Sequence, residues 1–137
     1  MAIPDLERKE IREAAEFLEK LGYIRSEDEY SIEYYSLDSI CINIVYPPYE
    51  KESDVNIRFI KKNKAFSIGW IALVRENVRG SEDRLENVKK LLKYIEEHHS
   101  QITDYRYCKM SDKLIDKYVE EHHEIFESSL RAFLDTL

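Results

Sequence analysis

Hydrophobic positions along this chain fall into three successive segments, with helical spacing in the first and the last and strand-like spacing between them. From Ile11 to Leu21, apolar residues recur every three or four positions, which indicates an amphipathic helix. Asp5 is expected to cap its start, because a carboxylate there accepts hydrogen bonds from the first helical N–H groups. Gly22 is expected to end it in the left-handed conformation that glycine tolerates. The first segment therefore predicts one helix from Asp5 to Gly22.

Between residues 29 and 74 the spacing of apolar residues shortens to two, as in β-strands with one buried face. Four strands are predicted, over residues 30–34, 40–45, 55–59 and 66–74. The connections between them are short, which favours an antiparallel meander.

The alternation also separates the two faces of this predicted sheet. One face is uniformly apolar and is expected to be the core: Ile40, Ile42, Ile44, Val55, Ile57, Phe59, Phe66, Ile68, Trp70 and Ala72. The opposite face is mixed, with polar residues at Asn43, Asn56, Arg58 and Ser67. We favour its partial coverage by the C-terminal helix, because a long helix with aromatic residues needs a surface to pack on. The alternative is a shallow binding surface.

Helical spacing returns in the last third of the chain. Ser81 is expected to cap a helix that contains Leu85 to Ile95, and Ser111-Asp112 is expected to begin another that runs toward the C-terminus. The predicted order is α-β-β-β-β-α-α. Residues 1–137 are therefore expected to form a single α+β domain, a four-stranded antiparallel meander with helices packed on the sheet.

Composition narrows the functional classes. The chain has 137 residues, of which 43% are hydrophobic and 36% charged. No apolar stretch reaches the roughly 18 residues of a membrane span, so no membrane partner is expected. The charged start lacks the apolar centre of a secretion signal, and two cysteines make no disulfide framework. These features predict a cytoplasmic protein.

Charge and tyrosine are concentrated in one window, residues 27–54. It holds eight acids and one lysine, so it accounts for the whole net charge of −7, and it contains five of the ten tyrosines. Nucleic-acid binding needs clustered Lys and Arg, so it is not expected. An acidic surface instead attracts basic partners and speeds their encounter. The alternative is that these acids only solvate hairpin edges and block edge-to-edge pairing.

Recognisable catalytic motifs are missing from the sequence. It has no glycine-rich phosphate loop, no HExxH and no GxSxG. Cys41 is expected to be buried in a strand. Cys108 is expected in a loop between Arg106 and Lys109, where a lowered thiol pKa is an alternative to an inert side chain. No catalytic residue is assigned.

Four histidines occur as two adjacent pairs, His98-His99 and His122-His123, among glutamates. Adjacent residues on a helix point about 100° apart, so one pair cannot chelate a metal with both rings. Two helices could bring one histidine from each pair together, with Glu121 as a third ligand. We favour structural roles near helix ends and in the interior, and expect no metal and no cofactor.

Three stretches of the chain carry a resemblance to a known family. They are the tyrosine–acid stretches DEYSIEYYSLDS (residues 28–39) and YPPYEKESD (residues 46–54), and FSIGWIALVREN (residues 66–77). In architecture the chain resembles the small acidic bacterial immunity proteins of polymorphic toxin systems. The resemblance implies an inhibitor that binds a cognate toxin domain and blocks its active site. No specific motif accompanies it, so no residue role is carried over.

The sequence thus predicts a non-enzymatic protein-binding module with a basic protein partner, which the resemblance identifies as a toxin domain. Tyrosine gives large contact area at low entropy cost, and acids match a basic cleft. The expected partner-binding residues are Tyr30, Glu33, Tyr35, Asp38, Tyr49, Glu50, Glu52 and Asp54. Two alternatives stay open: a metal-binding or enzymatic protein that uses the helical His and Glu groups, and a homodimeric structural or adaptor protein with Tyr118 and Phe133 in its contact.

Overall fold

A five-stranded sheet with helices on one side forms the body of the molecule. The computed structural model describes residues 3–46 and 53–122. Its elements in chain order are α1 (Asp5–Ala14), α2 (Glu16–Lys20), β1 (Ile24–Glu27), β2 (Ser31–Tyr35), β3 (Ile40–Val45), β4 (Asp54–Phe59), the 3-10 turn η1 (Ile60–Lys62), β5 (Lys64–Ser67), α3 (Ile68–Glu76), α4 (Arg84–Glu97), α5 (His99–Ile102) and α6 (Tyr105–Glu121). The predicted α+β class is confirmed.

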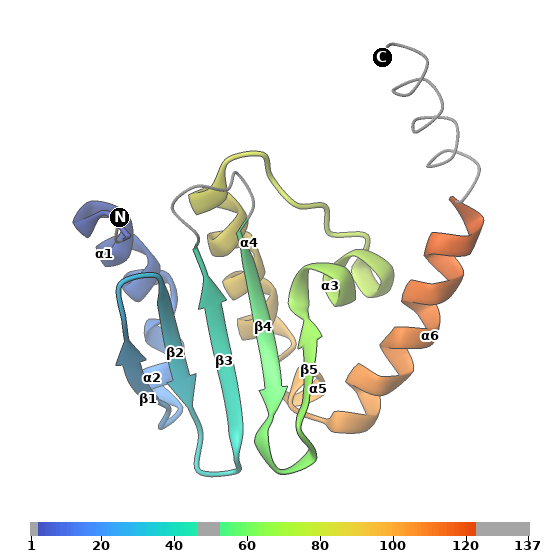
Figure 1. Ribbon diagram of the computed structural model, residues 1–137, viewed down its shortest axis with the longest axis horizontal. Coiled ribbons are helices and arrows are strands. Elements are labelled where there is room, and N and C mark those ends of the chain that lie inside the picture. The colour runs from blue at the N-terminus through green and yellow to red at the C-terminus, as the bar shows by residue number, and fades with distance from the viewer. Residues whose placement is uncertain (1–2, 47–52, 123–137) are drawn as a thin grey trace.

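The sheet is an antiparallel meander in the order β1-β2-β3-β4-β5 (Figure 1). Tyr34 of β2 lies opposite Ile42 of β3, which in turn lies opposite Ile57 of β4. The prediction of a meander is therefore confirmed, with one more strand than the four expected. The additional strand, β1, has four exposed residues and no apolar alternation, so the hydrophobic pattern did not reveal it.

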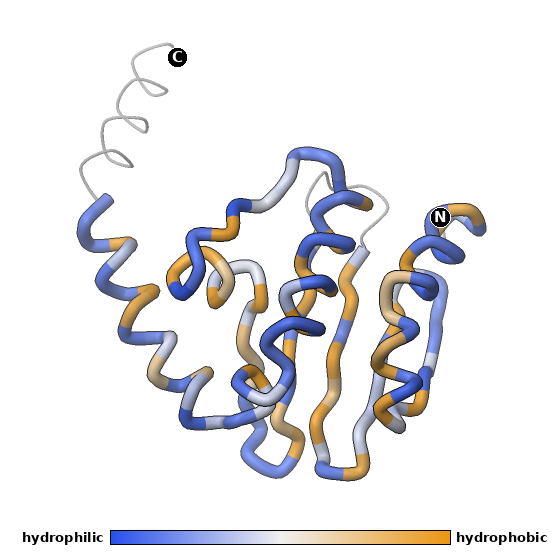
Figure 2. The backbone as a smooth tube through the Cα atoms, turned by 180° about the vertical axis from the view of Figure 1, so that it is seen from behind, coloured by the Kyte–Doolittle hydropathy of each residue, from blue (hydrophilic) through white to orange (hydrophobic). Residues whose placement is uncertain are grey.

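The core lies between the sheet and a layer of helices. In Figure 1 helices α1, α2, α4 and α5 lie behind the sheet, and Figure 2, seen from that side, shows hydrophobic positions recurring along α1, α4 and the central strands. Three members of the predicted N-terminal stripe, Ile11, Ala15 and Leu18, are fully buried. Strand and helix residues complete the core: Ile32, Tyr34, Ile42, Ile44, Val55, Ile57, Ile68, Ile71, Val88, Leu92 and Ile95.

The fourth predicted strand is wrong beyond Ser67. There the chain turns into α3, because the Ser67 hydroxyl accepts a hydrogen bond from the N–H of Trp70 and caps the helix. A short apolar run satisfies a strand and a buried helix equally well, so its spacing did not distinguish them. As a consequence Trp70, expected in the core, lies on a helix with 38% of its surface exposed.

The N-terminal helix also differs from its prediction. It is interrupted at Ala15, and its N-cap position is Pro4, which makes no side-chain cap; Asp5 is the first helical residue. Gly22 follows the second segment with φ at +97°, the left-handed conformation that the sequence predicted.

Two later helices begin at other residues than expected. Asp83, not Ser81, caps α4, and its carboxylate accepts from the N–H of Glu86 at 2.9 Å. Helix α6 begins two turns earlier than the predicted Ser111, because the Asp104 carboxylate caps it by accepting from Arg106 N–H. Its predicted continuation toward the C-terminus lies outside the described residues.

Candidate binding surface

The predicted interface residues divide between one face of the sheet and the two ends of β2. Glu33, Tyr35 and Asp54 share the sheet face that points away from the helices. Tyr30 lies in the bend before β2, with 46% of its surface exposed, and Asp38 lies in the exposed turn after β2. The remaining three, Tyr49, Glu50 and Glu52, lie outside the described residues.

We call this side the open face, because none of the described helices lies over it in Figure 1. Its side chains come from Ser31, Glu33, Tyr35, Cys41, Asn43, Val45, Asp54, Asn56, Arg58 and Ser67. A polar row crosses it, in which Glu33 lies opposite Asn43, Asn43 opposite Asn56, and Asn56 opposite Ser67. The coverage by a C-terminal helix that we favoured is not provided by α6, which packs against α3.

Glu33 is the centre of the contacts on the open face. Its Oε2 accepts a hydrogen bond from the Tyr35 hydroxyl at 2.9 Å and from the Cys41 thiol at 3.3 Å. The Arg58 guanidinium lies 3.7 Å from the same oxygen, and 44% of the Arg58 side chain is exposed. The Glu33 carboxylate thus contacts residues of β2, β3 and β4 and orients the Tyr35 hydroxyl. Its ion pair with Arg58 is long and solvent-accessible.

Asp54 occupies the other end of this face, where β4 meets β5 and α3. Its Oδ2 accepts from the Ser67 hydroxyl at 2.9 Å, and its Oδ1 accepts from Val55 N–H at 2.8 Å. Gly69 allows the close approach of α3, since a Cβ there would lie 3.3 Å from Asp54 Oδ1. Asp54 therefore both fixes the strand-to-helix junction and adds negative charge to the open face.

Asn43, at the centre of the polar row, has a buried Oδ1 with no hydrogen-bond partner in the described part of the chain. A buried acceptor without a donor costs about 1–3 kcal/mol. A donor that reached this oxygen would recover that free energy.

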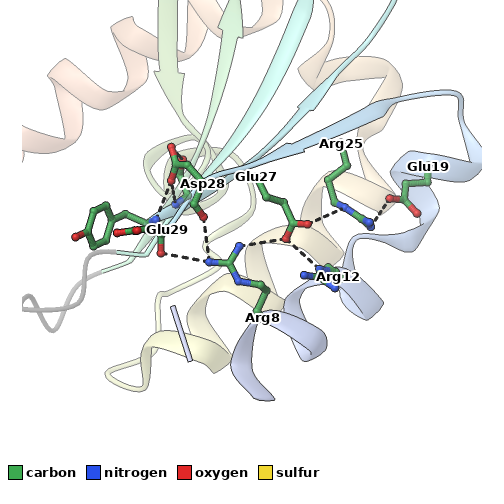
Figure 3. Close-up of polar contacts among 9 residues, drawn as sticks. Arg8, Arg12, Glu19, Arg25, Glu27, Asp28 and Glu29 are labelled. Carbon is green, nitrogen blue, oxygen red and sulfur yellow. Dashed lines mark hydrogen bonds and ion pairs between the residues drawn. The ribbon is translucent and has the colours of Figure 1, made fainter. Parts of the chain in front are cut away.

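Much of the acidic window is occupied within the protein. Figure 3 shows Glu27 of β1 surrounded by three arginines: its Oε1 lies 3.1 Å from Arg8 and 3.0 Å from Arg12, and its Oε2 lies 3.3 Å from Arg25. Burial opposes ionisation of Glu27, but the hydrogen bonds from Arg8 and Arg12 outweigh it and hold its pKa below 4.5. This cluster fastens the edge strand β1 to helix α1.

Asp28 is likewise engaged in the bend before β2. Its Oδ1 accepts from the N–H groups of Tyr30 and Ser31, and these backbone hydrogen bonds lower its pKa. Arg8 reaches past it and donates to the backbone carbonyls of Asp28 and Glu29. Glu27 and Asp28 are therefore engaged by groups of the chain itself.

A pocket of about 310 Å³ lies beside the place where the described chain stops after β3. Its wall includes Tyr46, whose ring lies 4.1 Å from the Arg84 guanidinium carbon and whose hydroxyl donates to Glu7 at 2.5 Å. Burial, followed by that bond to Glu7, raises the pKa of Tyr46 to about 12. Tyr46, one of the tyrosines of the acidic window, thus belongs to the core.

Both cysteines are fully buried. Cys41 lies in β3, as predicted, and burial followed by its bond to Glu33 raises its thiol pKa to about 12. Cys108 lies within α6 instead of the predicted loop, and its thiol donates to the carbonyl of Ile102 at 3.1 Å. Burial raises its pKa to about 12 as well, which contradicts the alternative of an activated thiol.

The described histidines end or begin helices and bond to their neighbours. His98 bonds Gln101 at 2.9 Å, His99 bonds the Tyr23 hydroxyl at 2.8 Å, and His122 bonds the carbonyl of Tyr118. Within residues 3–46 and 53–122, no group of three His, Cys, Asp or Glu side chains lies close enough to hold a metal ion. In the same residues no helix is long and apolar enough to cross a membrane.

Sequence reasoning named the polar positions of the open face but missed the arginine cluster that neutralises Glu27. The spacing of Arg8 and Arg12 on one face of the first helix was the available signal, since residues four apart are neighbours there. No family model, no curated protein and no solved structure matches this chain.

Proposed function

We propose that this chain is a non-enzymatic binding module of the immunity-protein type, which neutralises a basic toxin domain. The contact would be the open face together with the bends at both ends of β2. One observation carries the proposal: Glu33 and Tyr35 lie on the uncovered sheet face and are held there by a hydrogen bond of 2.9 Å. The resemblance to small acidic immunity proteins points the same way.

The open face is suited to this role by its rigidity. Its side chains stand on a continuous antiparallel ladder, so little conformational entropy is lost when a partner settles on it. Tyr35 offers an aromatic ring whose orientation is already fixed by Glu33. Preorganised aromatic groups of this kind act as hot spots in protein interfaces.

The attraction for a basic partner would come from a smaller set of acids than the whole window. Glu27 and Asp28 are engaged by arginines and backbone N–H groups. Glu33, Asp38 and Asp54 are the described acids that we assign to the contact because they lie on the open face or in the turn after β2, with Glu50 and Glu52 from the sequence. Glu33 and Asp54 also have partners within the chain. The exposed Arg58, only loosely paired with Glu33, would be displaced by a partner's guanidinium.

The experiment is quantitative capture of the partner from an extract of the native host, followed by affinity measurement with the isolated partner. Wild-type protein should bind one partner with 1:1 stoichiometry, more weakly at high salt. Glu33→Lys should reduce affinity at least about tenfold. Glu97→Lys is the matched control, because it makes the same charge change at an exposed position of α4, behind the sheet. Circular dichroism confirms that each variant is folded.

The toxin part of the proposal is tested separately. The captured partner, expressed alone, should arrest bacterial growth, and co-expression with this chain should restore it. A partner that binds but does not arrest growth would contradict the immunity function, and the proposal would then be reduced to a binding module. Equal affinity of wild type and Glu33→Lys would show that the open face is not the contact.

A further inference from the structure

Helices α3 and α6 pack against each other at the edge of the molecule beyond β5 (Figure 1). A pocket of about 500 Å³ is lined by residues of both helices, and we call it the α3–α6 groove. Apolar side chains line it from both helices, Leu73 and Val74 from α3 and Leu114 and Tyr118 from α6. It is distinct from the open face, which lies on the strands.

Large apolar groups are exposed around this groove. Trp70 has 38% of its surface exposed and meets Tyr118 edge to face, with ring centroids 6.1 Å apart. Leu114 is 37% exposed, and Met110, one turn earlier on α6, is 53% exposed. Clustered exposed apolar side chains, with a tryptophan among them, are typical of protein contact sites.

The two walls of the groove are held in a fixed relation by Arg75. Its Nε donates to the hydroxyl of Ser111 at 3.0 Å, and its Nη2 donates to the carbonyl of Tyr107 at 3.1 Å. The same guanidinium lies 4.1 Å from the centroid of the Tyr107 ring. The groove is therefore preformed, which lowers the entropic cost of filling it.

The charge of the groove differs from that of the chain as a whole. Its lining includes two cations and two acids, whose charges cancel: Arg75, Lys117, Glu76 and Glu121. A chain of net charge −7 repels its own copies, and a lining without net charge is a surface where that repulsion is weakest. A basic partner, in contrast, gains no net attraction from such a lining.

We propose that the α3–α6 groove is the contact between two copies of this chain, related by a two-fold axis. A two-fold contact is self-complementary, so each surface must offer both members of every pair. Glu76 on α3 and Lys117 on α6 meet this condition, since Glu76 of one copy can face Lys117 of the other. Trp70 and Leu114 of both copies would then be buried at the centre.

The test is sedimentation equilibrium over concentrations from about 1 to about 200 µM, a range that detects micromolar dissociation constants. Wild-type protein should shift from the monomer mass of 16.4 kDa to twice that value. Leu114→Glu should weaken dimerisation at least tenfold. Leu37→Glu is the matched control, because Leu37 is 92% exposed in the turn between β2 and β3, and it should dimerise like wild type.

The polar pairing has its own test. Glu76→Lys should weaken dimerisation, and the double variant Glu76→Lys with Lys117→Glu should restore it. Added salt should strengthen the dimer, because it screens the repulsion between two acidic copies more than it weakens two exposed ion pairs. Binding of a basic partner should weaken with salt, so the two proposals fail separately.

Two results would overturn the dimer. One is a monomer mass for the wild type at every concentration. The other is a Leu114→Glu variant, folded by circular dichroism, that dimerises as tightly as the Leu37→Glu control.

Discussion

The hydroxyl of Tyr23 lies 2.8 Å from Nε2 of His99, and the two rings meet edge to face with centroids 5.7 Å apart. This bond joins the residue that precedes β1 to helix α5. Burial lowers the pKa of His99 below 6.5. Burial, followed by the charge of Asp38, raises the pKa of Tyr23 to about 12. At neutral pH the bond therefore joins a protonated phenol and an uncharged imidazole.

This relationship predicts that acid weakens the fold below pH 6.5. An unfolded His99 takes up a proton near its ordinary pKa of 6.5, whereas the folded one does so only at lower pH. The unfolded state then binds more protons, so the free energy of unfolding decreases as pH falls below 6.5. Urea unfolding at about pH 7.5 and about pH 5.5 measures the difference. His99→Gln should reduce it and His98→Gln should not; an unchanged difference in His99→Gln would contradict the assignment.

The arginine cluster predicts that Glu27 stabilises the edge strand. Glu27→Gln should lower the free energy of unfolding by about 1–2 kcal/mol, because the hydrogen bonds from Arg8 and Arg12 then end on a neutral amide oxygen and lose their charge assistance. Glu29→Gln is the control, since Arg8 contacts only the backbone carbonyl of Glu29. The pKa of Glu27 is depressed below 4.5, so its contribution is present above that pH and lost as pH falls further. Denaturant melts at neutral pH that show equal stability for both variants would argue against the cluster.

Two residues at the beginning of α4 can be compared by alanine substitution: Asp83, which caps the helix, and Ser81, which was expected to do so. Asp83→Ala should cost about 1 kcal/mol, because the carboxylate that accepts from Glu86 N–H is removed. Ser81→Ala should cost less, since the Ser81 hydroxyl accepts from Asp83 N–H at 3.3 Å, outside the helix. Thermal unfolding distinguishes them, and a larger loss for Ser81→Ala would restore Ser81 as the more important residue of this turn.

The thiols predict slow chemical labelling. Both cysteines are fully buried, and burial raises their pKa values to about 12, so at pH 8 the thiols are almost entirely un-ionised. A disulfide reagent should modify neither cysteine of the native protein within minutes and both after denaturation. Cys108→Ser and Cys41→Ser identify any site that reacts. Rapid labelling of native Cys108 would contradict its place in α6.

The first half of the fold could be read from hydrophobic spacing with good accuracy, and the strand-to-helix junction could not. Strands β2, β3 and β4 alternate because one face is buried, and that alternation is visible in the residues themselves. Ile68–Val74 is apolar throughout, so a strand and a buried helix leave the same pattern. The outcome depended on the Ser67 cap and on Gly69, which admits the helix beside Asp54.

The candidate binding site was predicted in part for the same reason. Alternation placed Asn43, Asn56, Arg58 and Ser67 on one face, and the structure confirms that placement. Which acids are engaged could not be predicted, because two of the three arginines around Glu27, Arg8 and Arg12, come from a helix fifteen or more residues away.

By itself, the sequence determined the α+β class, the antiparallel meander and the buried side of its central strands, since these follow from local spacing and short connections. Only the tertiary structure decided that β1 exists, that Trp70 leaves the core, and that an open face and an α3–α6 groove remain. Each of these depends on contacts between residues distant in sequence, such as Arg8 with Glu27 or Arg75 with Ser111. Periodicity records which side of an element is buried, but not which element buries it.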